Sequence, residues 1–187
     1  DSVGADIVTS SLGYTEFDDK AASHKYREQD GRTALISRTA SMISGKGMIL
    51  TNSAGNTGAA EWKRIGFPGD AHDVLTVGAL APDSTNTTFS SVGPTYDGRV
   101  KPDVMAMGGY CTVINGKGLV AHANGTSFST PITCGLVACL WQALPNKTAS
   151  EIMQLVRESA DRADYPDNIF GYGIPDFWKA YQMGLNK

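Results

Sequence analysis

The residues best suited to catalysis lie in the segment Asn124-Gly-Thr-Ser-Phe-Ser-Thr-Pro131, which leads directly into an apolar run. The pattern predicts a loop that turns into a helix. Gly125 lets the backbone approach a ligand closely because it carries no Cβ. The first N–H groups of the helix lack partners within it and lie at the positive end of its dipole. Ser127 would therefore present a hydroxyl beside backbone donors, as a nucleophile next to an oxyanion requires. The alternative is that this serine only caps the helix.

Two further polar segments precede the serine. Thr51-Asn-Ser-Ala-Gly-Asn-Thr-Gly58 follows the apolar run Met48-Ile-Leu50, which predicts a buried strand that opens into a glycine-rich loop. Asn56 in this loop would, on its own, be read as a turn residue. The other segment, Asp6-Ile-Val-Thr-Ser-Ser-Leu-Gly-Tyr14, begins with residues that suit a strand and ends in a glycine.

Taken in order, the three segments resemble those of the subtilisin-like serine proteases (subtilases). The serine segment resembles the family's nucleophile motif Gly-Thr-Ser-(Met/Phe)-Ala-(Ser/Thr)-Pro and departs from it only at Ser129, where alanine is usual. The Asn56 loop resembles the family's Ala-Ala-Gly-Asn-Glu-Gly. Ser-Leu-Gly at 11–13 resembles the family's substrate-lining strand, and residues 89–94 and 97–104 also resemble subtilases. The resemblance runs from about Asp6 to Tyr181.

The resemblance implies a role for each site residue. Ser127 would be the nucleophile, Asn56 and the Ser127 N–H would hold the oxyanion, and Thr126 would support that hole as a second donor. The backbone at 11–13 would pair with an extended peptide by strand addition. The residues implied in substrate binding are Ser11, Leu12, Gly13, Ser53, Ala54, Gly55 and Gly125.

A subtilase triad runs Asp, His, Ser along the chain, and its first two members are not identifiable here. The three histidines, His24, His72 and His122, do not match the family's His-Gly-Thr, and none precedes the Ser-Leu-Gly strand. Asp1-Ser-Val-Gly4 resembles the family's Asp-(Ser/Thr)-Gly only faintly and is better read as a helix-to-strand loop. The sequence therefore assigns no catalytic acid or base.

We accordingly expect residues 1–187 to form the C-terminal portion of a subtilase catalytic domain, incomplete because the N-terminal part is absent. The expected fold is α/β, with a mostly parallel sheet and helices on both faces. The longer parent would be a serine endopeptidase acting on peptides or proteins, and this chain alone would be inactive. The alternative is a degenerate subtilase domain that binds or assembles without catalysis; an unrelated α/β binding domain is a third interpretation.

Composition excludes several other classes. With a formal net charge of −3 and no long charge run, the chain is a poor partner for nucleic acid or anionic membranes. No apolar stretch reaches the ~18 residues of a membrane span. No cofactor is expected. Structural calcium is common in subtilases, but Asp18-Asp19 and Asp161 to Asp167 show no ligand pattern, so we expect surface carboxylates. The resemblance implies an extracellular or cell-envelope location.

The cysteines do not form a disulfide scaffold or a zinc site, because only three are present and their spacing is unsuitable. Cys134 and Cys139 are predicted to be small core residues on the serine helix. Cys111 would be free or would pair with a residue outside this chain.

Periodicity and end signals predict an alternation of strands and helices. Strands are expected at about 6–11, 48–52, 74–80 and 104–107, and helices at about 32–45, 127–143, 148–160 and from about 175. The serine helix is apolar nearly all round, which predicts that it is buried. Without the preceding part of the domain, the strand at about 6–11 would be an open edge, so we also expect self-association there as a symmetric dimer.

Overall fold

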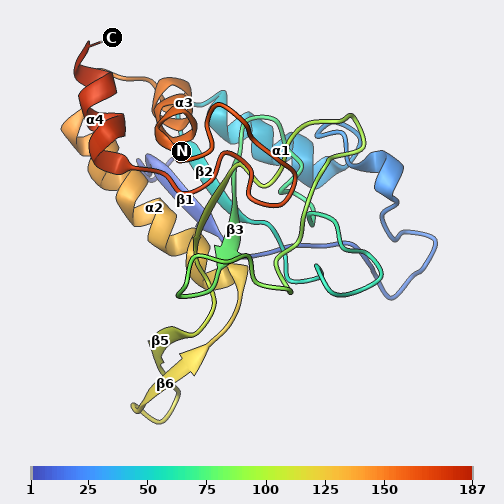
Figure 1. The fold of residues 1–187 in the computed structure, drawn as a ribbon. Coiled ribbons are helices and arrows are strands. Elements are labelled where there is room, and N and C mark those ends of the chain that lie inside the picture. Colours follow the sequence, from blue (N-terminus) through green and yellow to red (C-terminus); the bar gives the residue numbers. More distant parts are fainter. Residues whose placement is uncertain (1, 187) are drawn as a thin grey trace.

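The computed structural model describes residues 2–186, so Asp1 of the Asp1–Gly4 segment and the last residue, Lys187, lie outside the described residues. The strands and helices follow one another along the chain as shown in Figure 1. They are β1 (Ile7–Ser10), the 3-10 turn η1 (Tyr26–Glu28), α1 (Leu35–Ser44), β2 (Ile49–Ser53), β3 (Leu75–Leu80), β4 (Val104–Met107), β5 (Cys111–Ile114), β6 (Val120–Ala123), α2 (Thr126–Ala143), α3 (Ala149–Ser159) and α4 (Phe177–Asn186).

Four parallel strands form the central sheet in the order β1-β2-β3-β4. The register pairs Val8 with Leu50 and Val77 with Val104. Every residue of β2 and β3 is buried, which explains why these two strands carry no alternation of polar and apolar residues. Strands that follow one another in sequence lie side by side, so their carboxyl ends meet along one edge of the sheet.

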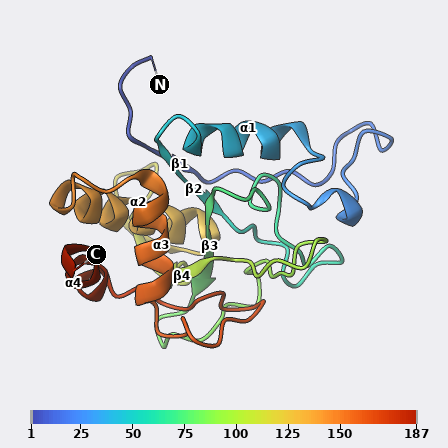
Figure 2. The same ribbon diagram turned by 90° about the horizontal axis from the view of Figure 1, so that it is seen from above.

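Helices cover both faces of the sheet, as predicted (Figure 2). On one face, α2, α3 and α4 bury a core that includes Ile49, Val77, Val137 and Ile152. On the other face, α1 contributes Ala40 to a smaller cluster with Leu50 and Val74. No helix within residues 2–186 is long and apolar enough to cross a membrane.

The prediction that α2 is buried all round is wrong. Its sheet-facing side carries Thr126, Thr130, Thr133 and Val137, whereas Ile132 and Leu136 on the other side are 43% and 44% exposed. The helix rests on the sheet with one face only, and within residues 2–186 no further layer covers the opposite one. Its apolar character therefore did not indicate burial on all sides.

Two of the cysteine predictions also need correction. Cys139 lies on the uncovered side of α2 and is exposed, and Cys134 is only partly buried. Cys111, at the start of β5, is buried, and its thiol donates to the Met107 carbonyl (3.6 Å). Burial raises the pKa of this thiol, which keeps it protonated.

A buried ion cluster fixes the amino ends of β3 and β4. Lys101 Nζ donates to Asp103 Oδ2 (2.6 Å) and to the Val74 carbonyl (3.0 Å), while Arg157 Nε on α3 donates to Asp103 Oδ1 (2.9 Å). The Thr76 N–H also donates to Asp103 Oδ2 (2.7 Å). Burial alone would raise the pKa of Asp103, but Lys101 and Arg157 outweigh it and hold that pKa below its usual value.

Candidate functional site

The predicted site residues meet at the carboxyl edge of the sheet, where ligands of open α/β folds generally bind. The loops after β1 and β2 and the first turn of α2 enclose a hollow of about 230 Å³. Its lining includes seven of the ten predicted residues: Ser11, Gly13, Ser53, Gly55, Asn56, Thr126 and Ser127. Three segments more than 30 residues apart in sequence thus converge on one small cavity.

The orientation of the Asn56 side chain is set by Thr126. Asn56 Oδ1 accepts from both the Thr126 N–H and the Thr126 hydroxyl, each at 2.9 Å. Because an N–H can only donate, this contact identifies the oxygen of the amide and leaves Nδ2 as the outward-facing donor. Thr126 is 1% exposed, and its hydroxyl also accepts from the Gly55 N–H (3.3 Å). The Thr126 hydroxyl therefore donates its hydrogen bond to Asn56 Oδ1 in this structure.

Ser127 lies one residue further along, in the first turn of α2. Within residues 2–186 its N–H has no hydrogen-bond acceptor and its hydroxyl has no partner, so both are free to meet a ligand. Its carbonyl faces Pro131, which has no N–H to donate back to it. The Ser11 hydroxyl supplies the missing donor, at 3.1 Å from the Ser127 carbonyl oxygen. The segment that follows β1 is thereby connected to Ser127.

Two glycines are required by the backbone around the hollow. Gly55 has φ +110°, and a Cβ placed on it would lie 2.8 Å from Ser91 Oγ. Gly125, directly before α2, has φ +155°, which side chains other than glycine rarely adopt. A Cβ there would stand 3.5 Å from Asn56 Nδ2. Any other residue at either position would strain the loop that presents the donors.

Three predicted residues lie beside the hollow and do not line it. Leu12 is 57% exposed, and its carbonyl accepts from Asn52 Nδ2 (3.3 Å) and Ser53 Oγ (3.4 Å). Ala54 is fully buried and Gly125 is buried at the helix start.

Three residues that line the hollow were not predicted from the sequence: Thr15, Thr57 and Gly66. Gly66 faces Gly13, because the Tyr14 N–H donates to the Phe67 carbonyl (2.9 Å) and draws the two segments together. The one local signal was the turn-like Gly66-Phe-Pro-Gly69. That signal marks a turn but does not say which loop it will face.

None of the three histidines reaches Ser127 within the described chain. His24 bonds to Glu28 (3.1 Å) and stacks on Phe67. His72 contacts the Asp30 carbonyl (3.1 Å) and does not line the hollow. His122, five residues before Ser127 in sequence, is exposed and stacks on Tyr110, with ring centroids 3.9 Å apart.

The described residues do not form a metal site. No group of three or more His, Cys, Asp or Glu side chains within residues 2–186 could hold a metal ion. Asp161 and Asp167 are engaged as turn residues, since their carboxylates accept from the Ile174 N–H (2.8 Å) and the Ile169 N–H (2.7 Å) respectively.

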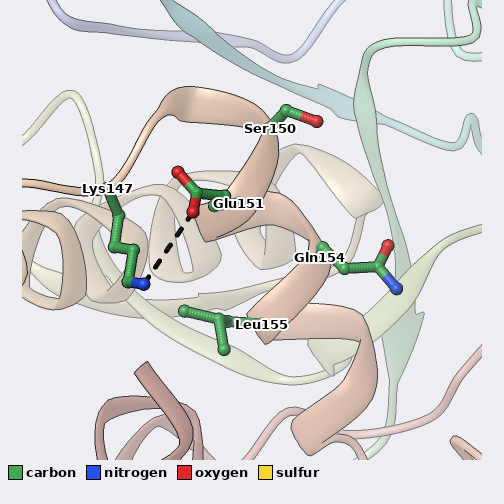
Figure 3. Close-up of a pocket in the computed structure, with 5 residues that line it drawn as sticks. All are labelled: Lys147, Ser150, Glu151, Gln154 and Leu155. Carbon is green, nitrogen blue, oxygen red and sulfur yellow. Dashed lines mark ion pairs between the residues drawn. The ribbon is translucent and has the colours of Figure 1, made fainter. Parts of the chain in front are cut away.

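A second hollow, of about 250 Å³, lies on α3, and Figure 3 shows its lining of Lys147, Ser150, Glu151, Gln154 and Leu155. Its one ion pair, Lys147 to Glu151 (3.8 Å), links residues one helical turn apart. None of the predicted site residues reaches it. Because it combines no nucleophile with converging donors, the hollow beside Ser127 is the better candidate for catalysis.

Comparison with known proteins shows the family to which the chain belongs. The family model described as the subtilase family matches residues 2–173. Serine protease AprX of Bacillus subtilis (strain 168) is 30% identical over 90% of this chain and 41% of its own length. Subtilisin DY of Bacillus licheniformis is 26% identical over 84% of this chain and 50% of its own. The chain thus spans half or less of the length of these two relatives.

Solved structures agree on the fold. The prenylagaramide maturation protease PagA superposes with a TM-score of 0.76 at 21% identity, covering 100% of this chain and 64% of PagA. The self-cleaved protease domain of PatA gives a TM-score of 0.72 at 24% identity, over 99% of this chain and 64% of that domain. Since the family match covers nearly the whole sequence, this chain belongs to the subtilase family.

Proposed function

We propose that the protein containing this chain is a subtilisin-like serine endopeptidase whose nucleophile is Ser127. The observation that carries the proposal is the double hydrogen bond from Thr126 to Asn56 Oδ1. It turns the amide so that Nδ2 and the free N–H of Ser127 are both available as donors beside one serine hydroxyl. Preorganised donors of this kind stabilise the charge that develops on a carbonyl oxygen during acyl transfer.

The chemistry follows from these positions. The Ser127 hydroxyl would attack the carbonyl carbon of the scissile peptide bond, losing its proton to a base and forming a tetrahedral intermediate. Asn56 Nδ2 and the Ser127 N–H would hold the oxyanion. The base and the acid that orients it would come from polypeptide outside these 187 residues, since no described histidine contacts Ser127.

The substrate is proposed to be an extended peptide. Ser11 and Gly13 carry backbone N–H and C=O groups with no partner among the described residues, as strand addition requires. The hollow is lined only by Ser, Gly, Thr and Asn, so it offers no charge to pair with a charged side chain. We therefore expect uncharged side chains at the position that fills it. We further propose an extracellular or cell-envelope location, supported by the family resemblance alone.

The first experiment is hydrolysis of chromogenic peptides by the full-length protein. Ser127→Ala should abolish turnover. Ser129→Ala is the matched control, because it removes a neighbouring hydroxyl and restores the alanine usual in the family. That hydroxyl is buried and donates to the Thr126 carbonyl (3.0 Å), so the control should cost some stability and little activity. Equal activity of Ser127→Ala and the parent would contradict the proposal.

The isolated 187-residue chain should show no peptidase activity. A serine without its base and acid retains only binding and oxyanion stabilisation. The test is the same assay on purified chain beside its Ser127→Ala variant, and turnover that disappears in the variant would mean that a residue of this chain acts as base. If the full-length protein is also inactive yet binds peptides, the alternative of a non-catalytic binding domain gains support.

A further inference from the structure

Residues 89–94 resemble subtilases in sequence but do not line the hollow beside Ser127. They run along the loop that carries Asn56. The Ser91 N–H donates to the Gly55 carbonyl (2.9 Å), and the Gly58 N–H donates to the Phe89 carbonyl (2.8 Å). Ser91 is fully buried. The segment therefore pairs with the loop on both sides of Asn56 while it contributes nothing to the surface of the cavity.

Asn56 itself is not held by regular secondary structure. It lies beyond the end of β2 and is exposed, and its own N–H and carbonyl have no hydrogen-bond partner among residues 2–186. The bonds from Thr126 determine which way the side-chain amide faces, but they act on its end and not on its Cα. The position of the Asn56 Cα must therefore be set by the residues on either side of it.

Ser91 bonds to both peptide groups that flank Asn56. Its N–H donates to the Gly55 carbonyl, which belongs to the peptide group before Asn56. Its Oγ accepts from the Thr57 N–H (3.1 Å), which belongs to the peptide group after Asn56. Because each peptide group is a rigid plane, one serine holds both planes that meet at the Asn56 Cα. Gly55 permits this approach, since a Cβ on it would lie 2.8 Å from Ser91 Oγ.

The hydroxyl of Ser91 can make this bond without leaving its own proton unpaired. Ser91 Oγ lies 2.9 Å from Thr57 Oγ1, and Thr57 Oγ1 in turn lies 3.4 Å from the Arg64 carbonyl oxygen. Since a hydroxyl carries one donor and two acceptor positions, Ser91 can donate to Thr57 Oγ1 while it accepts from the Thr57 N–H. Thr57 also lines the hollow, so the serine connects the wall of the cavity to the Asn56 loop.

We propose that Ser91 is a positioning residue that holds Asn56 where its side chain can reach the oxyanion. The inference rests on the proposed function, because that proposal gives Asn56 its role. Thr126 sets the direction of the amide, and Ser91 sets the place of the Cα from which the amide extends. Without the Ser91 hydroxyl the peptide group after Asn56 can turn, which displaces Nδ2. A displaced donor stabilises the oxyanion less, whereas the backbone at 11–13 that would bind the peptide stays as it is.

Ser91→Ala in the full-length protein should lower kcat by about 3- to 10-fold, the range that one neutral hydrogen bond supplies, with KM nearly unchanged. Ser90→Ala is the matched control. Ser90 is also buried, and its Oγ accepts from the Ala79 N–H (3.0 Å), so the same hydroxyl is removed from a bond to β3 and not to the Asn56 loop. Steady-state kinetics of both variants measures the difference, and an equal loss of kcat in the two would overturn the inference.

Combination with Asn56→Ala separates positioning from a general effect on the fold. If Ser91 acts through Asn56, adding Ser91→Ala to the Asn56→Ala protein should change kcat by less than about twofold. A further loss as large as that in the unaltered protein would overturn the inference. Turnover that survives Ser127→Ala would contradict the proposed function itself, so the two failures are told apart by different variants.

Amide hydrogen exchange tests the two bonds of Ser91 without an activity assay. In the unaltered full-length protein the Thr57 amide should be protected, because Ser91 Oγ accepts from it. In Ser91→Ala its exchange should become faster, while that of Gly58, bonded to the Phe89 carbonyl, should stay the same. A Thr57 amide that exchanges at the rate of an unbonded amide in the unaltered protein would overturn the inference, whether or not Ser91→Ala folds.

Discussion

At the scale of single residues, the central feature is that Asn56 and Thr126 have different parts in the proposed oxyanion site. The Thr126 hydroxyl, expected from the family resemblance to act as a second donor, gives its hydrogen to Asn56 Oδ1. Its contribution in this geometry is to hold the amide in the orientation that exposes Nδ2. On the proposed function, Thr126 would act as a positioning residue, and Asn56 would be the side chain that touches the oxyanion.

Asn56→Ala in the full-length protein should lower kcat far more than it raises KM. The oxyanion contact strengthens only as charge develops, so its loss appears in the transition state. The expected loss is about 10²–10³-fold in kcat, a magnitude known from subtilisin itself. The measurement is steady-state kinetics beside Asn146→Ala, an exposed asparagine away from the hollow. An unchanged kcat with an altered KM would mean that Asn56 is only a turn residue.

Thr126→Val should also lower kcat, by up to about tenfold, because a neutral hydrogen bond contributes roughly 0.5–1.5 kcal/mol. The valine keeps the branched shape and the N–H bond to Asn56 but removes the hydroxyl. Thr126→Ser keeps the hydroxyl and should recover most of the rate. If Thr126→Ser loses as much activity as Thr126→Val, the hydroxyl is not sufficient to hold the amide and the positioning role is wrong.

The sequence alone led to Ser127 and Asn56 because each stands in a long segment with few departures from a known pattern. It could not find Thr15 or Gly66, since these reach the hollow through the pairing of Tyr14 with Phe67, and no local pattern encodes which loops will face each other. The hydrogen bond from Ser11 to the Ser127 carbonyl was equally invisible, because it joins residues 116 apart.

At the scale of elements, α3 shows how a local signal can specify a boundary. Thr148 and Glu151 have the spacing of a capping box, and both of its bonds are present: the Glu151 N–H donates to Thr148 Oγ1 (3.3 Å) and the Thr148 N–H donates to Glu151 Oε2 (2.8 Å). These bonds satisfy N–H groups that the first turn of a helix leaves free.

Thr148→Ala should lower the free energy of unfolding by about 1 kcal/mol, the usual cost of losing such a cap. Chemical denaturation of the purified chain measures the change. Ser150→Ala is the control, since Ser150 is exposed on the same turn and makes no capping bond. An equal effect of the two substitutions would show that helix propensity, and not the cap, sets the stability of α3.

The strands of the parallel sheet and all four α-helices lay close to their predicted bounds, because apolar runs and end signals are properties of short segments. The hairpin of β5 and β6 was missed. Ile114 and Val120 are 67% and 69% exposed, although Cys111 at its start is buried, and the hairpin extends away from the body of the molecule (Figure 1). A two-stranded ribbon without a buried face leaves little periodicity to detect. The exposed side of α2 was not predicted either, because the apolar residues of a helix do not show by themselves whether another element covers them.

At the scale of the whole molecule, the cluster of Lys101, Asp103 and Arg157 links the sheet to α3 far from the proposed active site. Asp103→Asn should destabilise the chain by roughly 3–5 kcal/mol, because removal of one partner leaves buried charges uncompensated. Glu16→Gln is the control. Its ion pair with Lys20 has side chains 72% and 77% exposed, so its loss should cost less than about 1 kcal/mol.

The same cluster should make stability depend on pH in the acid range. The pKa of Asp103 is lowered in the folded chain, so the unfolded chain takes up the proton first as the pH falls. The stabilisation is complete above the ordinary Asp pKa of 3.8 and is lost as the pH falls through the lower folded value. Asp70 acts in the opposite sense, because burial raises its pKa. The free energy of unfolding, measured by denaturation at a series of pH values from neutral to acid, should therefore change less with pH for Asp103→Asn. An unchanged dependence on pH would exclude Asp103 as its origin.

The bond from Ser11 to the carbonyl of Ser127 also bears on how peptide length should influence the rate. A peptide bound along Ser11 and Gly13 would contact the segment that is hydrogen-bonded to the backbone of the nucleophile. Contacts several residues from the cleaved bond can then help to aim the hydroxyl, so their binding energy would be expressed in turnover and not only in affinity. Lengthening a substrate on this side should raise kcat, and Ser11→Ala, which cuts the connection, should make long and short peptides turn over at more similar rates.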